Sequence, residues 1–550
     1  MEGRPQNPIH SERVRVTQAA GIIALGNITS RVMGLVRVVV KSNLFGAGPH
    51  VSALDAAVRV PITLYDLLVG GMVSSALVPV LSEYAAPGRR AELWDLLSVL
   101  VRVAALVVCG LLLVGELLAP QAIFLMAGGL SPPAQSLATE LLRLVLPAIL
   151  FLNLAGILTG ALYALKRFTF PAFTAAIFNA AMVAVALTLA RHWGVHSMAI
   201  GLVVGAMLQV VLQIPGLRSA RFPLAADLRH PALRRIGRLY LPILVGLAVD
   251  KVLAEVLSYN LASHLGDSAI SWMEYAAQII QFPLGLVATA VSIATLPTLS
   301  QQASAEQTGP FQATLAQGLR LVLTLVIPAT FGLFVLANPL VALIFEHGDF
   351  TPADTVAVAE ALRYHLVGLI FAAVDWLLIF AFYARKETLT PALVGAATTV
   401  LYAITTLTLA WLGALNLPLL ILVNSLKWAA HAAMMVVLTR RRLVGLGDHA
   451  IWPLTLKATF ASLVMAVVTW GAMRTFIAAA LPGLAGELLV TVGAGSVGMM
   501  VYGLLAILLG VEEIHLLRAA VAYSAKRLTR LARQVIIPPP DETGRSEIEE

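Results

Sequence analysis

Charged residues are scarce in this chain. Asp, Glu, Lys and Arg make up 12% of its 550 residues, whereas 59% are hydrophobic and the mean hydropathy is +0.87. An ordinary soluble domain has roughly a quarter of its residues charged, so a soluble chain of this composition would lack a polar surface. Hydrophobic runs instead recur along almost the whole length, each long enough for the roughly 20 apolar residues that span a bilayer. The composition therefore predicts an all-α polytopic membrane protein.

Cysteine is almost absent, and so are the usual catalytic motifs. The one cysteine, Cys109, lies in an apolar run; it excludes an intramolecular disulfide and argues against a cysteine-ligated metal cluster. No P-loop, H-E-x-x-H motif or nucleophile–base pair is evident, and the G-x-G-x-x-G match at 493–498 lies within an apolar span, where close helix packing explains it better. We expect a transporter and not an enzyme, with no cofactor, no metal and no nucleic-acid partner.

Fourteen stretches of the sequence predict transmembrane helices. Several exceed a minimal crossing, which indicates tilt, kinks or extension beyond the bilayer. The first lacks a small-residue cleavage pattern, so we expect it to be retained as a helix. The predicted spans are residues 16–45, 52–84, 92–127, 134–165, 170–192, 196–217, 232–264, 268–301, 312–345, 353–384, 389–413, 417–439, 451–480 and 484–510.

Basic residues gather in alternate loops, which explains the sequence pI near 9.6 without a nucleic-acid partner. Cytoplasmic loops of membrane proteins carry an excess of Lys and Arg. The alternation predicts an even number of crossings in a cell membrane, with both termini cytoplasmic. After the last span, 512–535 is either an amphipathic helix on the inner leaflet or a solvated helix, and the tail to residue 550 has a disordered composition. The basic loops contain Arg89, Arg90, Lys166, Arg167, Arg218, Arg221, Arg229, Arg234, Arg235, Arg238, Arg385, Lys386, Arg440, Arg441 and Arg442.

Two motifs recur at nearly the same spacing. The segment ALVPVLS at 76–82 reappears as ATLPTLS at 294–300, and the Tyr-Ala, basic, Pro-Ala pattern of 163–172 reappears at 383–392, giving offsets of 218 and 220. Six crossings separate each pair, so the halves are parallel, an arrangement in which substrate lies between them. The predicted units are a cytoplasmic N-terminus (1–15), an N-lobe of six helices (16–220), a C-lobe of six helices (221–445), two further helices (446–511) and a cytoplasmic segment (512–550).

Ionisable residues inside the spans are candidates for a binding site, because they are costly at bilayer depth. Arg31 and Arg37 have no acidic partner within their own helix, which favours a substrate-facing role, and guanidinium groups suit phosphate. Two other sets remain open between substrate binding and pairs that lock helices together: Asp55 with Arg59, and Lys251 with Glu255, each at i, i+4. Further candidates are Asn27, Lys41, Asp66, Glu274, Asp375, Lys427 and His431.

Several segments resemble the MurJ/MviN family of lipid II flippases, within the multidrug/oligosaccharidyl-lipid/polysaccharide exporter superfamily. The first of them, SRVMGLVR at 30–37, is followed by LFGAG at 44–48. The other segments keep the family's order over about the first 440 residues: 74–84, 167–179, 271–283, 344–351 and 382–391.

The resemblance implies two six-helix lobes around a cationic cavity, and two further helices that form a groove for a polyprenyl tail. It also implies alternating access that carries a lipid-linked peptidoglycan precursor from the inner to the outer leaflet. Arg31 and Arg37 match the family's first-helix arginines, and the resemblance gives them the diphosphate. Membrane lipids and cell-wall synthesis proteins are the other expected partners.

The sequence departs from the family pattern at positions that bear on the substrate. Ser52 stands where the family has an aspartate, with Asp55 one turn later, and Gln278 stands where it has an eighth-helix arginine. Arg59, Lys251 and Lys427 are candidates for the missing positive charge. Two alternatives therefore stay open: an exporter of another polyprenyl-linked glycan or amphiphile, and a cell-wall scaffold without transport activity.

Overall fold

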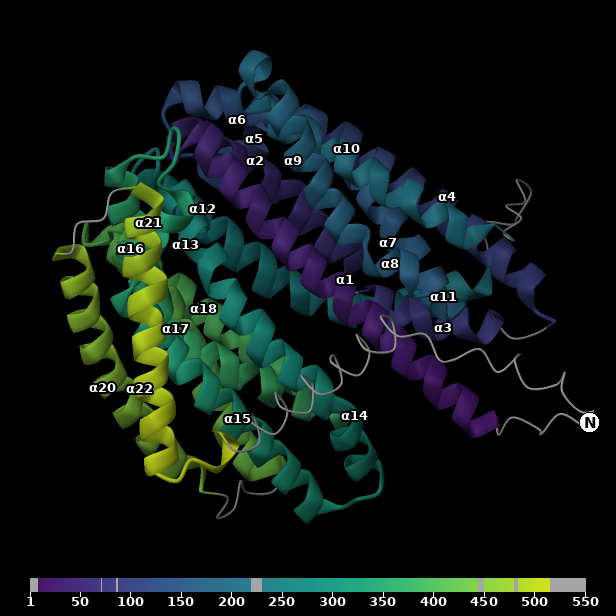
Figure 1. Cartoon of the computed structure of the whole chain (residues 1–550). Coiled ribbons are helices and arrows are strands. Elements are labelled where there is room, and N and C mark those ends of the chain that lie inside the picture. The colour runs from purple at the N-terminus through teal and green to yellow at the C-terminus, as the bar shows by residue number, and fades with distance from the viewer. Residues whose placement is uncertain are drawn as a thin grey trace, which may run out of the picture.

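The computed structural model describes residues 8–70, 72–85, 88–218, 230–443, 450–478 and 483–514. Helices account for its regular structure, and no strand occurs in these ranges. Figure 1 shows two bundles that diverge from a common end, with α1 running diagonally between them. The expected all-α fold is therefore confirmed.

The first bundle is the N-lobe, which begins at the long helix α1. Its elements are α1 (Pro8–Phe45), α2 (Pro49–Tyr65), η1 (Asp66–Gly70), η2 (Val73–Leu77), α3 (Val78–Tyr84), α4 (Arg90–Leu117), α5 (Ala119–Ala127), α6 (Pro132–Val145), α7 (Ala148–Ala164), α8 (Thr169–Ala172), α9 (Thr174–Trp193), α10 (His196–Gln213) and η3 (Ile214–Leu217).

The second bundle is the C-lobe, to which a C-terminal group of helices is added. The C-lobe elements are α11 (Pro231–Leu247), η4 (Ala248–Leu253), α12 (Ala254–His264), α13 (Ala269–Pro283), η5 (Leu284–Thr289), α14 (Ala290–Ser304), α15 (Thr308–Val335), α16 (Ala337–Phe345), α17 (Pro352–Ala384), α18 (Leu389–Trp411), α19 (Leu417–Leu438) and η6 (Thr439–Leu443). The C-terminal elements are α20 (Ile451–Ala478), α21 (Gly483–Leu488), η7 (Leu489–Gly493) and α22 (Ala494–Leu508).

Helix starts and helix interiors follow from local chemistry. At the start of α17, the Thr351 hydroxyl accepts a hydrogen bond from the Asp354 amide, and the Asp354 carboxylate accepts one from the Thr351 amide. Pro352 occupies the first turn, where its missing N–H is not needed. Inside the apolar spans, threonine hydroxyls donate to carbonyls one turn back, as Thr324 does to Arg320 at 2.8 Å, which satisfies the hydroxyl within its own helix.

The number of membrane crossings agrees with the prediction only in part. Within the described ranges, eleven helices are long and apolar enough to cross a bilayer, or twelve if the bent pair α6 and α7 forms one span. The predicted second and seventh spans, 52–84 and 232–264, are instead chains of α and π segments that carry charged residues. The count of fourteen therefore remains a prediction.

The internal repeat is visible in the helix boundaries. Helices α4 and α15 both have 28 residues, α5 and α16 both have nine, and each pair starts at positions 218 apart. The turns at Lys166 and Lys386 are equivalent too: both residues have positive φ, and the amide after each bonds back to the carbonyl five residues earlier. The two motif offsets therefore reflect a duplicated arrangement of helices.

Helix α11 falls in the predicted C-lobe range but packs on the N-lobe. Its Ala232, Ile236 and Tyr240 share a buried core with η1, η2, α3 and α7. The Tyr240 hydroxyl donates to the Leu67 carbonyl, and Arg235 forms an ion pair with Glu83 at 2.7 Å. The π segment η4 then leads into α12, which packs against α13, α18 and α19 of the C-lobe.

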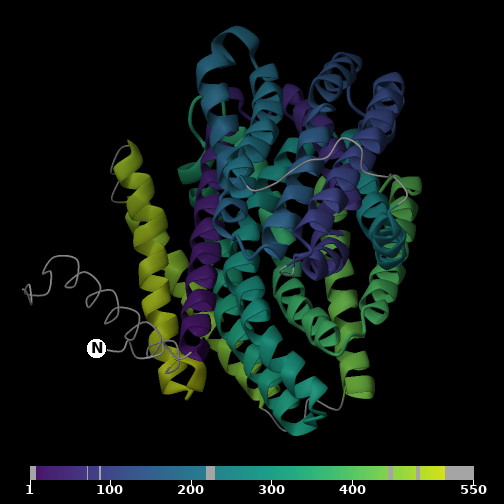
Figure 2. The same ribbon diagram turned by 90° about the vertical axis from the view of Figure 1, so that its right-hand side faces the viewer.

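The C-terminal helices α20 and α22 lie against the C-lobe. They pack on α15 through a buried cluster that includes Met465 and Tyr502, whose hydroxyl donates to the Thr324 carbonyl at 2.7 Å. Figure 2 shows the yellow C-terminal helix at one flank of the molecule, away from the blue N-lobe helices. Most of the predicted cytoplasmic segment 512–550 lies outside the described residues.

Candidate substrate-binding site between the lobes

A cluster of charged side chains lies where the two lobes face each other, and we call it the interlobe cluster. It is built by α1 and α2–η1 of the N-lobe, and by η4–α12 and α13 of the C-lobe. The helices that face α1 each contain or adjoin a π segment, a feature that is frequent at functional sites. Its members are Arg31, Arg37, Lys41, Asp55, Arg59, Asp66, Lys251, Glu255 and Glu274.

Arg31 reaches from α1 across to the C-lobe. Its Nη1 lies 3.5 Å from the Gln281 carbonyl oxygen, at the outer limit of a hydrogen bond, and its guanidinium lies over Gly285. A Cβ at position 285 would collide with that guanidinium, so the glycine makes room for the arginine. This contact closes the gap between α1 and the α13–η5 helix.

Arg37 lies two turns further along α1. Its Nη1 contacts the Met182 sulfur at 3.8 Å, and the carboxylates of Asp55 and Glu274 act on it electrostatically. In the described part of the chain, neither Arg31 nor Arg37 forms an ion pair. The guanidinium groups of both arginines therefore keep N–H groups that could donate hydrogen bonds to a bound anion.

Lys41, on the same helix, pairs with Asp55, the residue that the sequence had suggested as a partner of Arg59. Its Nζ donates to both oxygens of Asp55, at 2.8 and 2.9 Å, and lies 4.4 Å from the centre of the Tyr275 ring. The Asp55–Arg59 pair, one of the two interpretations that the sequence left open, does not form in this conformation, because the Lys41 ammonium of α1 pairs with Asp55. Asp55 then fixes α1 to α2.

Arg59 pairs across the lobes instead. Its Nη2 lies 3.2 Å from Glu255 on α12, and Thr63 donates to the other oxygen of the same carboxylate at 2.8 Å. The guanidinium also lies over the Tyr259 ring, 5.5 Å from its centre, and Tyr259 in turn donates to Glu274. One carboxylate of the C-lobe thus holds two side chains of the N-lobe.

Lys251 forms both the helical pair that the sequence suggests and a second pair. It lies 3.7 Å from Glu255 one turn later, and 3.4 Å from Asp66 of η1 on the other lobe. The Lys251 side chain is 40% exposed, against 18% for Glu255, so it is the more solvated partner. The pairing is therefore a three-residue link between lobes and not only a bond within one helix.

The cluster spans much of the membrane depth. Counted along the helices at 1.5 Å per residue, Arg37 lies about 12 Å, Arg59 about 15 Å and Arg31 about 21 Å from the loop that joins α1 to α2. These depths fall inside a hydrocarbon core of roughly 30 Å. Five cations face four carboxylates, so the fully ionised cluster keeps one excess positive charge, which favours an anionic ligand.

The other predicted site residues take smaller roles in this conformation. Ser52 is fully buried, and its hydroxyl accepts a hydrogen bond from the Ser271 amide at 3.1 Å, so it joins α2 to α13. Gln278 is half-buried on α13, between Glu274 and the Gln281 carbonyl that Arg31 approaches. Asn27 is exposed on α1, one turn before Arg31. None of these three adds a charge to the cluster.

The lobes are closed at the end where α1 meets α2. The Gly46 and Ala47 carbonyls accept from the Tyr275 and Ser271 hydroxyls at 2.8 and 2.6 Å, and the Asp349 amide donates to the Asn43 carbonyl at 3.0 Å. Beside them, the α5–α6 loop and the α12–α13 loop are joined by the Ser131 amide, which donates to the Asp267 carboxylate at 2.8 Å, and neighbouring bonds join α12 to α5 and to the α5–α6 loop.

At the opposite end the lobes are joined differently. Among described residues, the hydrogen bonds and ion pairs there that connect the two sequence halves come from α11, as the Arg235–Glu83 pair does. The closed end therefore seals the interlobe cluster on one side of the membrane.

Three contributing residues, two tyrosines and a glycine, could not be picked out from the sequence alone. Tyr259 and Tyr275 place aromatic faces beside Arg59 and Lys41, and their position shortly before or within the 271–283 motif was the available signal. Gly285 makes room for Arg31, and only its position after Pro283 distinguished it. No group of three or more His, Cys, Asp or Glu among the described residues could hold a metal ion.

Comparison with known proteins identifies the family. A family profile described as "Lipid II flippase MurJ" matches residues 41–490. The lipid II flippase MurJ of Burkholderia cenocepacia is 32% identical over 375 residues, which cover 66% of this chain and 72% of the relative. This chain belongs to the lipid II flippase MurJ family. The probable lipid II flippase MurJ of Vibrio cholerae is 32% identical over 396 residues, covering 69% and 75% of the two chains.

Solved structures give the same fold. A lipid II flippase MurJ in an inward closed conformation superimposes with a TM-score of 0.76 at 23% identity, covering 88% of this chain and 98% of that one. A multidrug resistance MATE family transporter of the MOP superfamily, in an inward-facing conformation, gives 0.62 at 14% identity over 76% of this chain. The family that the sequence motifs indicated is confirmed, and the fold is similar to that of a transporter of the MOP superfamily.

Proposed function

We propose that this protein carries lipid II from the cytoplasmic to the outer leaflet, by alternating access of the site between its lobes. The observation that carries the proposal is the state of Arg31 and Arg37, two arginines at bilayer depth without an ion-pair partner among the described residues. Such groups are costly unless they serve a function. Their forked guanidinium groups donate paired hydrogen bonds to phosphate oxygens, so a lipid-linked diphosphate suits them.

Arg59 and Lys251 are the proposed source of the charge that Gln278 lacks. Both lie in the interlobe cluster, and both are held by carboxylates, Glu255 and Asp66. A diphosphate that enters between the lobes competes with these carboxylates for the same cations. Substrate binding would then weaken the Arg59–Glu255 and Lys251–Asp66 links, and with them the contact between the lobes.

The proposal includes an orientation and a cycle. With both termini cytoplasmic, the closed end at 43–48 faces outward, and the site opens toward the cytoplasm. The π segments η1, η4 and η5 adjoin the cluster and are the proposed hinges. A cycle requires that lipid II bind the two states with different affinity, and the competition at Arg59 and Lys251 supplies such a difference. The exposed apolar faces of α20 and α22 are proposed to hold the polyprenyl tail.

A leaflet-exchange assay in proteoliposomes with a labelled lipid II analogue tests the proposal. We expect Arg31→Ala and Arg37→Ala each to slow exchange at least about tenfold, since each removes charge-assisted hydrogen bonds to the diphosphate. Arg191→Ala is the matched control, because Arg191 is an exposed arginine in the last turn of α9, outside the cluster and away from the proposed tail-binding helices. Unchanged exchange in both cluster variants would contradict the proposed role of the arginines.

Lipid that is retained through purification separates lipid II from another polyprenyl-linked glycan. We expect mass spectrometry of the purified full chain to find lipid II. A different lipid-linked glycan would favour the second candidate, which rests on Gln278 in place of the family's arginine. Wild-type protein that exchanges no lipid would indicate a scaffold in cell-wall synthesis.

A further inference from the structure

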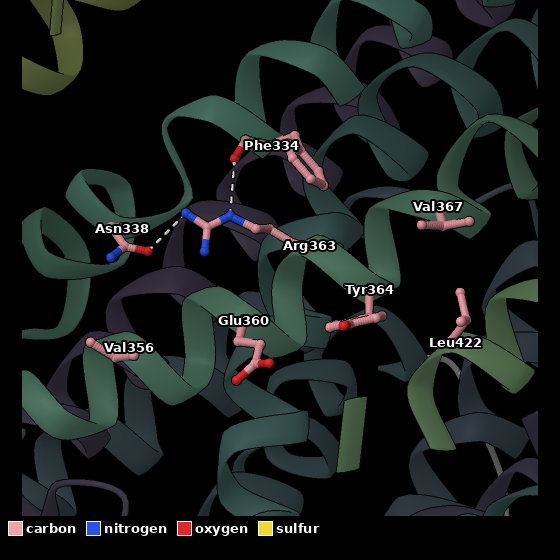
Figure 3. A pocket seen from close by; sticks show the side chains of 8 residues that line it. All are labelled: Phe334, Asn338, Val356, Glu360, Arg363, Tyr364, Val367 and Leu422. Atoms are coloured by element: carbon pink, nitrogen blue, oxygen red, sulfur yellow. Dashed lines mark hydrogen bonds between the residues drawn. The ribbon is translucent and has the colours of Figure 1, made fainter. Parts of the chain in front are cut away.

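A second polar site lies on the outside of the C-lobe and shares no residue with the interlobe cluster. It is a pocket of about 510 Å³ between the end of α15, the start of α16, the first half of α17 and the start of α19 (Figure 3). Arg363 and Glu360 of α17 provide its charges, and Phe334, Val367 and Leu422 are among its apolar residues. The interlobe substrate site does not account for this pair of charges.

The pocket lies beside the end of a candidate membrane span. Helix α15 is such a span, and it ends at Val335. Arg363 contacts the Phe334 carbonyl oxygen at this end and the Asn338 side chain in the first turn of α16. The charges of Arg363 and Glu360 are therefore placed beside the end of a span, and Val367 lies one turn further along α17.

Arg363 is held in place with one terminal nitrogen left over. Its Nη2 donates to the Asn338 side chain at 2.9 Å, and its Nε lies 3.4 Å from the Phe334 carbonyl oxygen. Its Nη1 has no hydrogen-bond partner among the described residues, and in Figure 3 one terminal nitrogen points toward Glu360. A guanidinium fixed in this way presents its remaining donors to a phosphate.

Glu360 supplies the opposite charge without neutralising Arg363. It is exposed, lies one turn before Arg363 on the same helix, and forms no ion pair with it in the described structure. The exposed side chains of Val367, which is 41% exposed, and Phe334, which is 46% exposed, continue the site toward the membrane. The site thus combines a cation, an anion and an apolar wall.

We propose that this pocket binds a phospholipid with a primary ammonium headgroup, of the phosphatidylethanolamine class. Its phosphate lies on Arg363, its ammonium donates to Glu360, and its acyl chains run along Phe334, Val367 and Leu422. A phosphatidylglycerol headgroup has no ammonium, so it would leave the Glu360 charge without a counter-charge from the lipid. A phosphatidylcholine headgroup cannot donate a hydrogen bond to the carboxylate. The chemistry does not depend on the transport function, and only the choice of leaflet depends on the proposed orientation.

Native mass spectrometry of the full chain in detergent tests this site, with lipids of the three classes carrying identical acyl chains. We expect wild type to bind phosphatidylethanolamine more tightly than the other two. Arg363→Gln should weaken binding of all three, about tenfold for phosphatidylethanolamine, since a charge-assisted contact is lost. Glu360→Gln should remove the preference for phosphatidylethanolamine and leave phosphatidylglycerol binding equal or tighter.

Two further variants make the result decisive. Arg474→Gln removes another exposed arginine, in the last two turns of α20, and should leave the affinities unchanged. Arg363→Lys keeps the charge but loses the fork, so it should fold like wild type and bind more weakly. The proposal is overturned if wild type prefers phosphatidylglycerol, if Arg363→Gln and Arg363→Lys bind like wild type, or if Arg474→Gln weakens binding as much.

Discussion

The N-lobe and the C-lobe use the same helical plan but present different charges to each other. Helices α4 and α5 match α15 and α16 in length and spacing, and the turns at Lys166 and Lys386 have the same backbone shape. At the interface, however, the N-lobe contributes four of the five cations. The C-lobe contributes Lys251 and two carboxylates, Glu255 and Glu274.

This difference shows which parts of a duplicated fold remain equivalent. Helix lengths and turns are set by packing within each lobe, which is the same task on both sides. Under the proposed function, the facing surfaces must instead bind one substrate between them and hold the lobes together. In this conformation Glu255 of the C-lobe pairs with Arg59 of the N-lobe, and in the proposed cycle an anionic substrate takes its place.

The largest effect is expected from Arg59 and Glu255, the pair that joins the two lobes at 3.2 Å. Arg59→Glu places two carboxylates together, and Glu255→Arg places two guanidinium groups together. The pair is only partly buried, with the Arg59 and Glu255 side chains 30% and 18% exposed, but each single variant replaces an attraction by a repulsion between like charges, so each should slow lipid exchange by at least about tenfold. The double variant restores the pair in reverse, and we expect exchange within about threefold of wild type.

The same double-mutant cycle decides whether the lobes are interchangeable at this position. Exchange rates of the four proteins in proteoliposomes give the coupling energy. If the double variant is rescued, an ion pair at this position is required, but which lobe carries the arginine is not important. A double variant as slow as either single variant would instead show that the arginine must stand on the N-lobe, which contradicts our expectation.

A smaller effect is expected at the closed end, from Gly348→Ala. Gly348 has positive φ, and a Cβ there would collide with the Asn43 backbone, so the substitution strains the contact between the lobes. Positive φ alone costs a non-glycine residue about 1–2 kcal/mol. We expect the closed state to lose about tenfold in population relative to the open one.

Cysteine labelling can measure that opening. Cys109 is the chain's one cysteine, so Cys109→Ala gives a clean background, and Ser52→Cys places a thiol at a fully buried site between α2 and α13. A membrane-impermeant maleimide should label this thiol faster after Gly348→Ala. Gly413→Ala is the matched control, because Gly413 has positive φ but no neighbour within 4 Å of its Cβ position. Equal labelling in both glycine variants would mean that position 348 does not hold the lobes closed.

The sequence predicted the all-α fold, and it singled out Arg31 and Arg37 as candidates, from features that need no coordinates. Hydrophobic length located the spans, and matched offsets located the repeat. Arg31 and Arg37 stood out because their own helix offers them no acid. These inferences needed only helix geometry and the cost of charge in a bilayer.

The pairing of the other charges could not be predicted in the same way. Asp55 and Arg59 are neighbours on one helix, yet Asp55 pairs with Lys41, and Arg59 reaches Glu255 in the other lobe, 196 positions away. Which face of a helix meets which partner depends on its rotation, and π segments change that rotation midway. The contacts at the closed end could not be predicted for another reason. They are made to backbone carbonyls, such as those of Gly46 and Ala47, and backbone groups leave no pattern in the order of side chains.

The smallest effect is expected from Lys251→Gln, which tests the one cation that the C-lobe contributes. Its two ion pairs are long, at 3.4 and 3.7 Å, and its side chain is 40% exposed. Solvated pairs of this kind contribute about 0–1 kcal/mol, so we expect lipid exchange to slow by less than about fivefold. Lys427→Gln, a second C-lobe lysine that lies near the Tyr402 and Trp428 rings, is the matched control. If Lys251→Gln instead slowed exchange as much as Arg37→Ala while Lys427→Gln did not, Lys251 would be a direct ligand of the substrate, and the C-lobe would supply positive charge as essential as that of the N-lobe.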